Sequence, residues 1–237
     1  MAEIAVKKFQ ATDFQTAEAL KTLRSNLIFS GTDIQAVELT SFNASEGKST
    51  VSFQLALSMA QAGKRVVLVD ADLRKSVLVS SLKVRERIVG LSHYLSGQAK
   101  LEDTLCKTDV PGFYILFSGA RVPNSSELLG SPNFRKMIPA LKNVFDYIIV
   151  DAAPLGLVID AAVMAPMLDG AVLVIDSTKN SYRFERRILQ QLKKSGGKVL
   201  GVVLNRVNFK DRGGYYGGKK YGYGYGYGYG YGGSDES

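Results

Sequence analysis

Cysteine and histidine are nearly absent from this 237-residue chain, which holds one of each, Cys106 and His93, and no tryptophan. One cysteine cannot form an intrachain disulfide, and one cysteine beside one histidine cannot build a metal cluster. This usage is typical of a reducing compartment. His93 lies in a short apolar stretch and is predicted to be an ordinary helix residue, so a Ser-His-Asp hydrolase is poorly supported.

Long apolar runs are also missing from the sequence. No stretch approaches the roughly 18 apolar residues that cross a bilayer. Residues 1–8 lack the apolar segment of a signal peptide. We therefore expect a cytoplasmic chain that lies at the inner face of the membrane only through a partner.

Basic residues exceed acidic ones, with 30 Lys and Arg against 22 Asp and Glu, for a net charge of +8. The basic residues occur in small scattered groups, and no basic run interleaves with aromatic residues in the pattern of nucleic-acid binding. A nucleic-acid partner is not expected.

Apolar strand-like runs alternate with helical stretches along most of the chain. The strand runs are apolar on both faces, which is typical of a sheet covered on both sides, and the alternation favours parallel strands. We predict one α/β domain with a doubly wound, mostly parallel sheet over residues 1–209. Strands are expected at 36–41, 66–69, 114–117, 147–150, 171–175 and 199–204, and helices at 14–29, 51–62, 133–142 and 182–194.

The composition changes sharply near the end of the chain. Residues 213–233 are almost entirely Gly and Tyr, and the two alternate strictly over 221–231. Glycine at every second position weakens a strand and supplies no packing face. We predict that residues 210–237 form a flexible, disordered tail.

The segment between the first predicted strand and its following helix has the form of a phosphate-binding loop. Backbone N–H groups of such a loop cradle phosphates, Lys48 would reach the β- and γ-phosphates, and the Ser49 hydroxyl would bind Mg²⁺. The usual pattern begins with Gly, where this chain has Phe42. The sequence predicts a P-loop NTPase of deviant Walker type that binds ATP through Ser45, Glu46, Gly47, Lys48, Ser49 and Thr50.

Acidic residues follow two of the predicted strands. Asp70 and Asp72 come after 66–69, and Asp151 follows 147–150. Ligands bind at the carboxyl ends of strands in such sheets. If the strand continues past Asp70, Asp70 and Asp72 point the same way. We expect Ser49, Asp72 and Asp151 to hold Mg²⁺ and Asp70 to act as the base, although sequence leaves open an exchange with Asp72. Arg74 would orient Asp72 or meet a neighbouring subunit.

With these residues the chain resembles bacterial tyrosine kinases of the capsule and exopolysaccharide type. The resemblance is carried by the apolar run and D-x-D-x-R pattern of 66–74, the segments 123–129 and 201–205, and the tyrosine-rich tail. It implies an ATP- and Mg²⁺-dependent protein-tyrosine kinase with Asn205 at the adenine. The residues expected to be catalytic are Lys48, Asp70, Asp72 and Asp151.

The same resemblance implies how the kinase would be organised. Autophosphorylation would occur between subunits of a ring and would regulate capsular or exopolysaccharide synthesis. The family's E-x-x-R-x-x-R oligomer motif appears here as Glu18, Lys21 and Arg24, with Lys at the middle position. Expected partners are a transmembrane activator of the polysaccharide chain-length type and a phosphotyrosine phosphatase. The expected acceptors are Tyr215, Tyr216, Tyr221, Tyr223, Tyr225, Tyr227, Tyr229 and Tyr231.

The main alternative is a partition- or division-type ATPase of the same P-loop class. Those proteins usually carry an additional lysine early in the loop, where this chain has Asn43, and they lack a Tyr-Gly tail. A third alternative is a regulator that binds ATP without catalysis. This alternative is disfavoured by the presence of Lys48, Asp70, Asp72 and Asp151.

Overall fold

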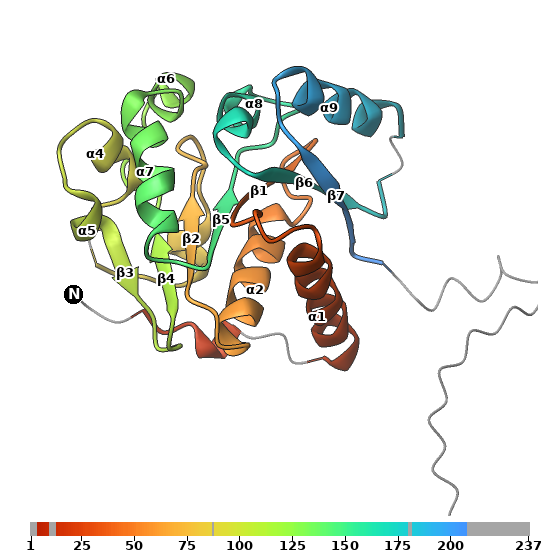
Figure 1. Cartoon of the computed structure of the whole chain (residues 1–237), viewed down its shortest axis with the longest axis horizontal. Helices are drawn as coiled ribbons and strands as arrows, with labels where there is room; N and C mark the ends of the chain where they lie inside the picture. The colour runs from red at the N-terminus through yellow and green to blue at the C-terminus, as the bar shows by residue number, and fades with distance from the viewer. Residues whose placement is uncertain (1–3, 10–12, 87, 180–181, 208–237) are drawn as a thin grey trace, which may run out of the picture. The chain divides into compact units, whose positions relative to one another are not determined.

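Seven strands form one twisted sheet in the computed structural model, which describes residues 4–9, 13–86, 88–179 and 182–207, without the side chains of 182–185 (Figure 1). The strand order is β3-β4-β2-β5-β1-β6-β7. All pairings are parallel except that between β3 and β4. The predicted doubly wound, mostly parallel sheet is therefore confirmed.

The strands are the Val-, Ile- and Leu-rich runs of the sequence, and burial on both faces explains why they do not alternate with polar residues. Every residue of β1, β2 and β6 is buried. The bounds are β1 (Ala36–Ser41), β2 (Val66–Asp70), β3 (Leu105–Lys107), β4 (Phe113–Leu116), β5 (Tyr147–Asp151), β6 (Gly170–Asp176) and β7 (Val199–Asn205).

The four longer helices correspond to the predicted ones: α1 (Phe14–Phe29), α2 (Lys48–Gln61), α7 (Pro132–Lys142) and α9 (Tyr182–Lys194). Helix α2 begins at Lys48 rather than at residue 51, because the phosphate loop leads directly into it. Several short elements carry no readable periodicity and were not predicted. These are η1 (Lys7–Phe9), α3 (Leu78–Ser81), α5 (Leu101–Thr104), α6 (Ser125–Leu129), α8 (Asp160–Met164), η2 (Ala165–Met167) and β3. The short helix α4 (Leu91–Leu95) contains His93, which was predicted to be a helix residue.

Helix starts show why these segments begin where they do. The Asp13 side chain accepts a hydrogen bond from Thr16 N at 2.8 Å and caps α1, and Ser131 does the same for α7. Helix α2 has no side-chain cap, and its N-cap residue is Gly47 in the left-handed region. Its first N–H groups are thus open to a ligand rather than to a side chain.

Helices cover both faces of the sheet (Figure 1), and a hydrophobic core lies beneath the helices on each face. On one face, Leu27 of α1 and Phe53 of α2 pack with Leu39 of β1. On the other, Met137 of α7 and Ile188 of α9 pack with strand residues of the same sheet. This three-layer packing fixes the sheet, and therefore the positions of the loops at its carboxyl edge.

The carboxyl ends of the central strands lie side by side. In the sheet register Asp70 of β2 is level with Asp151 of β5, and Asp151 is level with Leu39 of β1. The loop after β1 and the acids ending β2 and β5 therefore meet at one edge, where open α/β sheets bind ligands.

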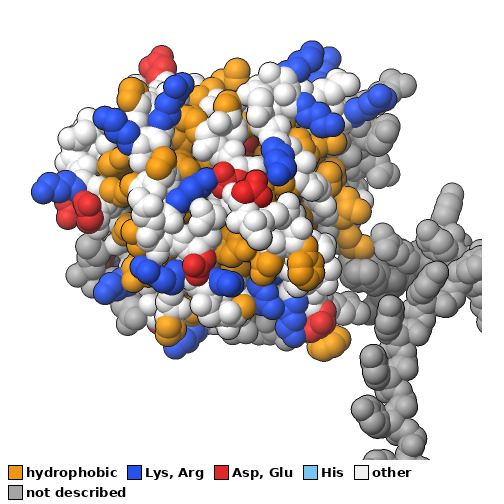
Figure 2. Space-filling view, viewed as in Figure 1, with side chains coloured by type: hydrophobic (Ala, Val, Ile, Leu, Met, Phe, Trp, Pro, Cys, Tyr) orange, Lys and Arg blue, Asp and Glu red, His pale blue; other side chains and the backbone are white. Residues whose placement is uncertain are grey.

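The described residues up to Arg206 form one compact unit, and the predicted tail lies outside the described residues. Among the described helices, none combines the length and apolar character that a membrane span requires. Lys and Arg side chains are spread over the visible face in small groups, interspersed with acidic and apolar ones (Figure 2). On this face they form no single basic surface.

Glu38 is an unusual residue in the middle of β1. Its side chain is fully buried, and no described residue donates a hydrogen bond to either carboxylate oxygen. Burial raises the pKa of Glu38 well above its usual value of 4.5. The folded protein therefore binds this proton more tightly than the unfolded chain does, and the contribution of Glu38 to stability falls as pH rises above the unfolded pKa.

Glu38→Met is expected to raise the free energy of unfolding by about 1–3 kcal/mol at pH 8, because it removes a buried polar group without partners. The gain should shrink as the pH falls from 8 towards the usual pKa of 4.5, because the folded state then takes up its extra proton at a smaller free-energy cost. Urea unfolding of wild type and variant across this range measures both effects. A variant equally or less stable at pH 8 would contradict the argument.

Candidate functional site: the loop after strand β1

The loop between β1 and α2 is built as a rigid cradle. Ser45 and Gly47 have φ of 63° and 91°, which turn the chain tightly. The Glu46 carboxylate lies inside the turn, where it accepts hydrogen bonds from Phe42 N at 3.0 Å and from Asn43 Nδ2 at 3.5 Å. Glu46, predicted to bind ATP, thus braces the loop from within.

The loop tolerates Phe42 at a position that is usually Gly because another glycine makes room. Gly156 N donates a hydrogen bond to Phe42 O at 3.1 Å. A Cβ on Gly156 would lie only 2.5 Å from Cδ2 of the Phe42 ring. The ring packs against the core on the α7 face of the sheet, so the departure from the usual pattern leaves the loop intact.

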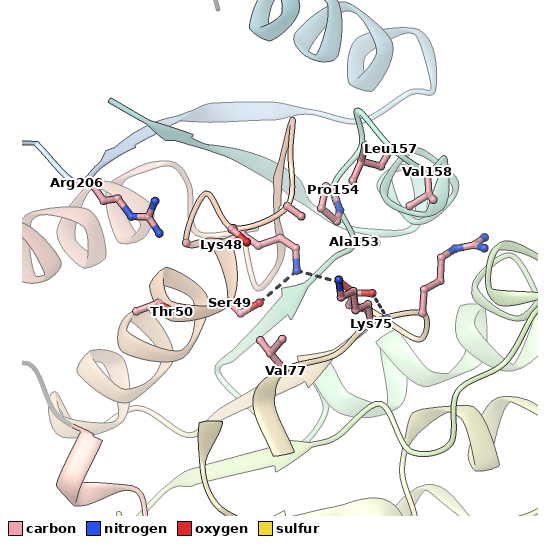
Figure 3. A pocket seen from close by; sticks show the side chains of 15 residues that line it. Lys48, Ser49, Thr50, Lys75, Val77, Ala153, Pro154, Leu157, Val158 and Arg206 are labelled. Carbon is pink, nitrogen blue, oxygen red and sulfur yellow. Dashed lines mark hydrogen bonds and ion pairs between the residues drawn. The ribbon is translucent and has the colours of Figure 1, made fainter. Parts of the chain in front are cut away.

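Lys48 lies at the centre of the site, and Figure 3 shows its side chain reaching towards Ser49. Its Nζ is 3.2 Å from Ser49 Oγ, 3.3 Å from Asp72 Oδ2 and 3.4 Å from Asp151 Oδ1. Burial alone would lower the pKa of Lys48, but Asp151, Asp72 and Asp70 together outweigh burial and raise it. The lysine is therefore held as a cation.

The three predicted magnesium ligands thus converge on one point, now occupied by a cationic group. Hydroxyl and carboxylate oxygens are the ligands that Mg²⁺ prefers, and it commonly takes one or two carboxylates with substrate phosphates and water. The set Ser49, Asp72 and Asp151 fits such an ion. Ser52 Oγ, 3.4 Å from Asp151 Oδ1, further orients that carboxylate and was not predicted.

Asp70 is in a different environment from Asp72, contrary to the expectation that both point the same way. Strand β2 ends at Asp70, so the alternation does not extend to Asp72. Asp70 Oδ2 accepts hydrogen bonds from the Ser76 hydroxyl and from Ser118 N, while no described residue donates to its buried Oδ1. Burial, with the charge of Asp151 second, raises the pKa of Asp70 to about 7.

Arg74 does not orient Asp72 directly, as one reading of the sequence proposed. Its guanidinium donates to Asp160 through Nε at 2.9 Å and Nη2 at 3.0 Å. Asp160 begins α8 and was not singled out from sequence. The only hint was the family-like segment 123–129, whose serines contact this pair.

Asn205 lies against the phosphate loop. Its Nδ2 donates a hydrogen bond to Glu46 O at 2.9 Å, which links the end of β7 to the loop. Arg206 follows with φ of 58° and donates through Nη1 to Asp176 at 2.6 Å. Arg206 and Lys75 both border the pocket and were not predicted (Figure 3).

A pocket of about 330 Å³ opens between these elements. Its polar lining includes Lys48, Ser49, Thr50, Asp72, Arg74, Lys75 and Arg206, beside the backbone of Gly47. Its apolar part comes from the segment after β5, with Ala153, Pro154, Leu157 and Val158, and from Val77, which directly precedes α3. Ser45 also lines it, so the predicted phosphate-loop residues other than Glu46 border one cavity.

The residues predicted to build an oligomer interface lie on α1, away from this pocket. Lys21 Nζ pairs with Glu18 Oε1 at 2.6 Å, and both side chains are about half exposed. Arg24 instead donates to Ser58 O and Oγ at 2.8 and 3.0 Å within its own chain. The eight predicted acceptor tyrosines, 215–231, lie outside the described residues.

The loop, the strand-end acids and the position of the pocket define a P-loop nucleotide-binding protein. A family model described as an AAA domain matches residues 35–200. The septum site-determining protein MinD of Pyrococcus horikoshii OT3, solved with Mg-ADP, is similar in fold, with a TM-score of 0.63 and 28% identity, covering 74% of this chain and 71% of that one.

Kinases are more similar still. Tyrosine-protein kinase CpsD of Streptococcus agalactiae is 45% identical over 194 residues, which is 82% of this chain and 85% of that protein. The kinase domain of VpsO gives a TM-score of 0.76 at 32% identity, covering 82% of this chain and 96% of that one. The chain belongs to the family of bacterial tyrosine-protein kinases with an AAA-type P-loop domain.

Gly47→Ala tests the cradle, since a Cβ there would lie 2.0 Å from Asn205 Nδ2. We expect Mg-ATP affinity to fall by roughly tenfold or more, about 1.4 kcal/mol, in a titration with a fluorescent nucleotide. Gly63→Ala is the matched control, because Gly63 also has positive φ, 81°, but open space around it. Equal losses in both variants would assign the effect to backbone strain rather than to the Asn205 contact.

Proposed function

We propose that this chain is a Mg-ATP-dependent protein-tyrosine kinase that phosphorylates the tyrosine cluster of its own tail, between subunits. The observation that carries the proposal is the convergence of Lys48, Ser49, Asp72 and Asp151 at one end of the pocket. Together with 45% identity to a named tyrosine kinase, it supports transfer chemistry rather than nucleotide binding alone.

Phosphoryl transfer needs positioning and charge neutralisation more than covalent participation by the protein. We assign the loop N–H groups and Lys48 to the phosphates, where the lysine would exchange its carboxylate partners for phosphate oxygens. Ser49, Asp72 and Asp151 would hold Mg²⁺, which would neutralise charge developing on the transferred group. Thr50 lies beside them at the start of α2 and borders the pocket.

Asp70 is our choice for the group that accepts the tyrosine proton. Its Oδ1 has no described donor, and a base with a pKa of about 7 is partly ionised at neutral pH. Asp72 is less suited to this role, because its oxygens are already taken by Lys48 Nζ and by Lys75 N at 2.9 Å.

The organisation of the active kinase is proposed from the family. Glu18, Lys21 and Arg24 of α1 would contribute to a ring-like homo-oligomer, and Asn205 would lie at the adenine. A transmembrane activator would hold the chain at the inner face of the membrane and complete the nucleotide site. A phosphotyrosine phosphatase would reverse the modification, and the cycle would regulate capsular or exopolysaccharide synthesis.

The alternative is a division-type ATPase without kinase activity, and the similarity in fold to MinD supports this alternative. The loop has Asn43 rather than a lysine at the position that such ATPases use. The activity test therefore measures phosphotyrosine and ATP hydrolysis together.

Incubation with Mg-ATP, with and without an activator tail, followed by mass spectrometry, should find phosphotyrosine within residues 215–231. Lys48→Met should reduce it by roughly 100-fold or more, since an electrostatic contact to the transferred phosphate is lost. A chain with those tyrosines changed to Phe is the control. ATP hydrolysis without phosphotyrosine, even with activator present, would favour the division-type ATPase.

Asp70→Asn and Asp72→Asn should separate the two acids. Asp70→Asn is expected to bind Mg-ATP within about threefold of wild type yet lose roughly 10²- to 10⁴-fold in transfer rate, the range of general-base catalysis. Asp72→Asn should in addition need more Mg²⁺ for nucleotide binding. The opposite pattern would exchange the two roles.

A further inference from the structure

An ion pair at the border of the pocket joins three segments that are far apart in the sequence. Asp160 at the start of α8 has a fully buried side chain, and Arg74 is 35% exposed. The guanidinium donates two hydrogen bonds to the two carboxylate oxygens, at 2.9 and 3.0 Å. Ser125 Oγ donates a further one to Asp160 at 2.6 Å, and Arg74 Nη2 reaches Ser126 Oγ at 3.3 Å.

The pair anchors the short segment that carries the acids of the site. From Arg74 the chain continues to Lys75, whose N–H donates to Asp72 Oδ1, and to Ser76, whose hydroxyl donates to Asp70. Asp72 in turn faces Lys48. The three successive residues Arg74, Lys75 and Ser76 thus connect Asp160 to the carboxylates of Asp72 and Asp70.

Asp160 also lies close in the chain to the residues that line the other side of the pocket. It follows the segment after β5, in which Pro154, Leu157 and Val158 line the cavity. Ser125, fully buried at the start of α6, donates a hydrogen bond to Asp160 and is not itself one of the residues that line the pocket. The segment after β2 and the segment after β5 are therefore fixed against one another through this one carboxylate.

We propose that Asp160, through its two-pronged contact with Arg74, positions the 72–76 segment for metal binding and transfer. The proposal rests on the proposed function. A buried ion pair adds little net stability, because desolvation offsets its attraction, whereas its planar geometry constrains orientation strongly. Asp160 and Arg74 are thus positioning residues for Asp72 and Asp70 rather than catalytic ones.

Arg74 also borders the pocket, so a direct contact with nucleotide or acceptor is the competing explanation. The two explanations differ in what Asp160 does. If Arg74 acts only through Asp160, loss of either partner has the same consequence, and loss of both adds nothing. If Arg74 touches substrate itself, changes at Asp160 matter little.

The test is a double-mutant cycle of Arg74→Lys, which keeps the charge but lacks the planar fork, with Asp160→Asn, which keeps the shape but lacks the charge. For each variant we would measure the transfer rate and the Mg²⁺ concentration that half-saturates binding of a fluorescent ATP analogue. We expect each single variant to lose about tenfold or more in rate and to need about fivefold more Mg²⁺. The double variant should be no worse than the more impaired single variant.

Asp169→Asn is the matched control. Asp169 also pairs with a cation, Lys142 at 2.5 Å, and accepts backbone hydrogen bonds, but it lies at the amino-terminal edge of the sheet. It should leave rate and Mg²⁺ requirement within about twofold of wild type. Ser125→Ala is the second variant if Asp160→Asn does not fold, because it loosens Asp160 without touching Arg74, and it should shift both measurements in the same direction.

The proposal would be overturned if folded Asp160→Asn kept its rate and Mg²⁺ requirement within twofold of wild type. If Asp160→Asn does not fold, the same result in Ser125→Ala would overturn it. Impairment by Arg74→Lys alone would also overturn it, in favour of direct contact with substrate. A wild-type chain that forms no phosphotyrosine with activator present would instead count against the proposed kinase function, while the Mg²⁺ measurement would still decide on the positioning role.

Discussion

The buried ammonium group of Lys48 is the constraint on which the rest of the site depends. A cation removed from water is costly unless charges and hydrogen bonds compensate it. Here the compensation comes from Ser49, Asp72 and Asp151, which belong to different segments of the chain. Only a sheet whose central strands run parallel brings the ends of β1, β2 and β5 to one place. The strand order is therefore as much a requirement of the site as of the core.

The phosphate loop is held in its turn by side chains of the protein itself. Glu46 fills the interior of the turn, Asn205 fastens it to the end of β7, and Gly156 leaves space for Phe42. A loop held in this way needs little reorganisation to receive phosphates, so less binding energy is lost to ordering. The same contacts explain why a chain that departs from the usual loop pattern at Phe42 keeps its geometry.

The sequence predicted the features that depend on long patterns. Six apolar runs became strands, and four periodic segments became helices, because burial on both faces or on one face leaves a readable period. Short elements such as α8 have no such period, so neither α8 nor the role of its first residue, Asp160, was predicted. The proximity of Lys48, Ser49 and Asp151 followed from strand-loop-helix context. The contrast between Asp70 and Asp72 could not be predicted, since it depends on where β2 ends and on Ser76 and Ser118.

Two buried acids of the sheet show how context decides what a carboxyl group does. Burial raises the pKa of both Glu38 and Asp151, but only Asp151 faces a cation that offsets the effect. Burial therefore favours the neutral form of Glu38 without opposition, whereas Lys48 favours the charged form of Asp151. Three carboxyl groups, those of Asp151, Asp72 and Asp70, attract the Lys48 ammonium group, while Arg74, Lys75 and Arg206 also border the pocket. A polyphosphate in the pocket would be attracted by these cations and repelled by the carboxylates, and a divalent cation among the carboxylate oxygens would reduce that repulsion. The proposed binding of a metal together with the nucleotide agrees with this arrangement.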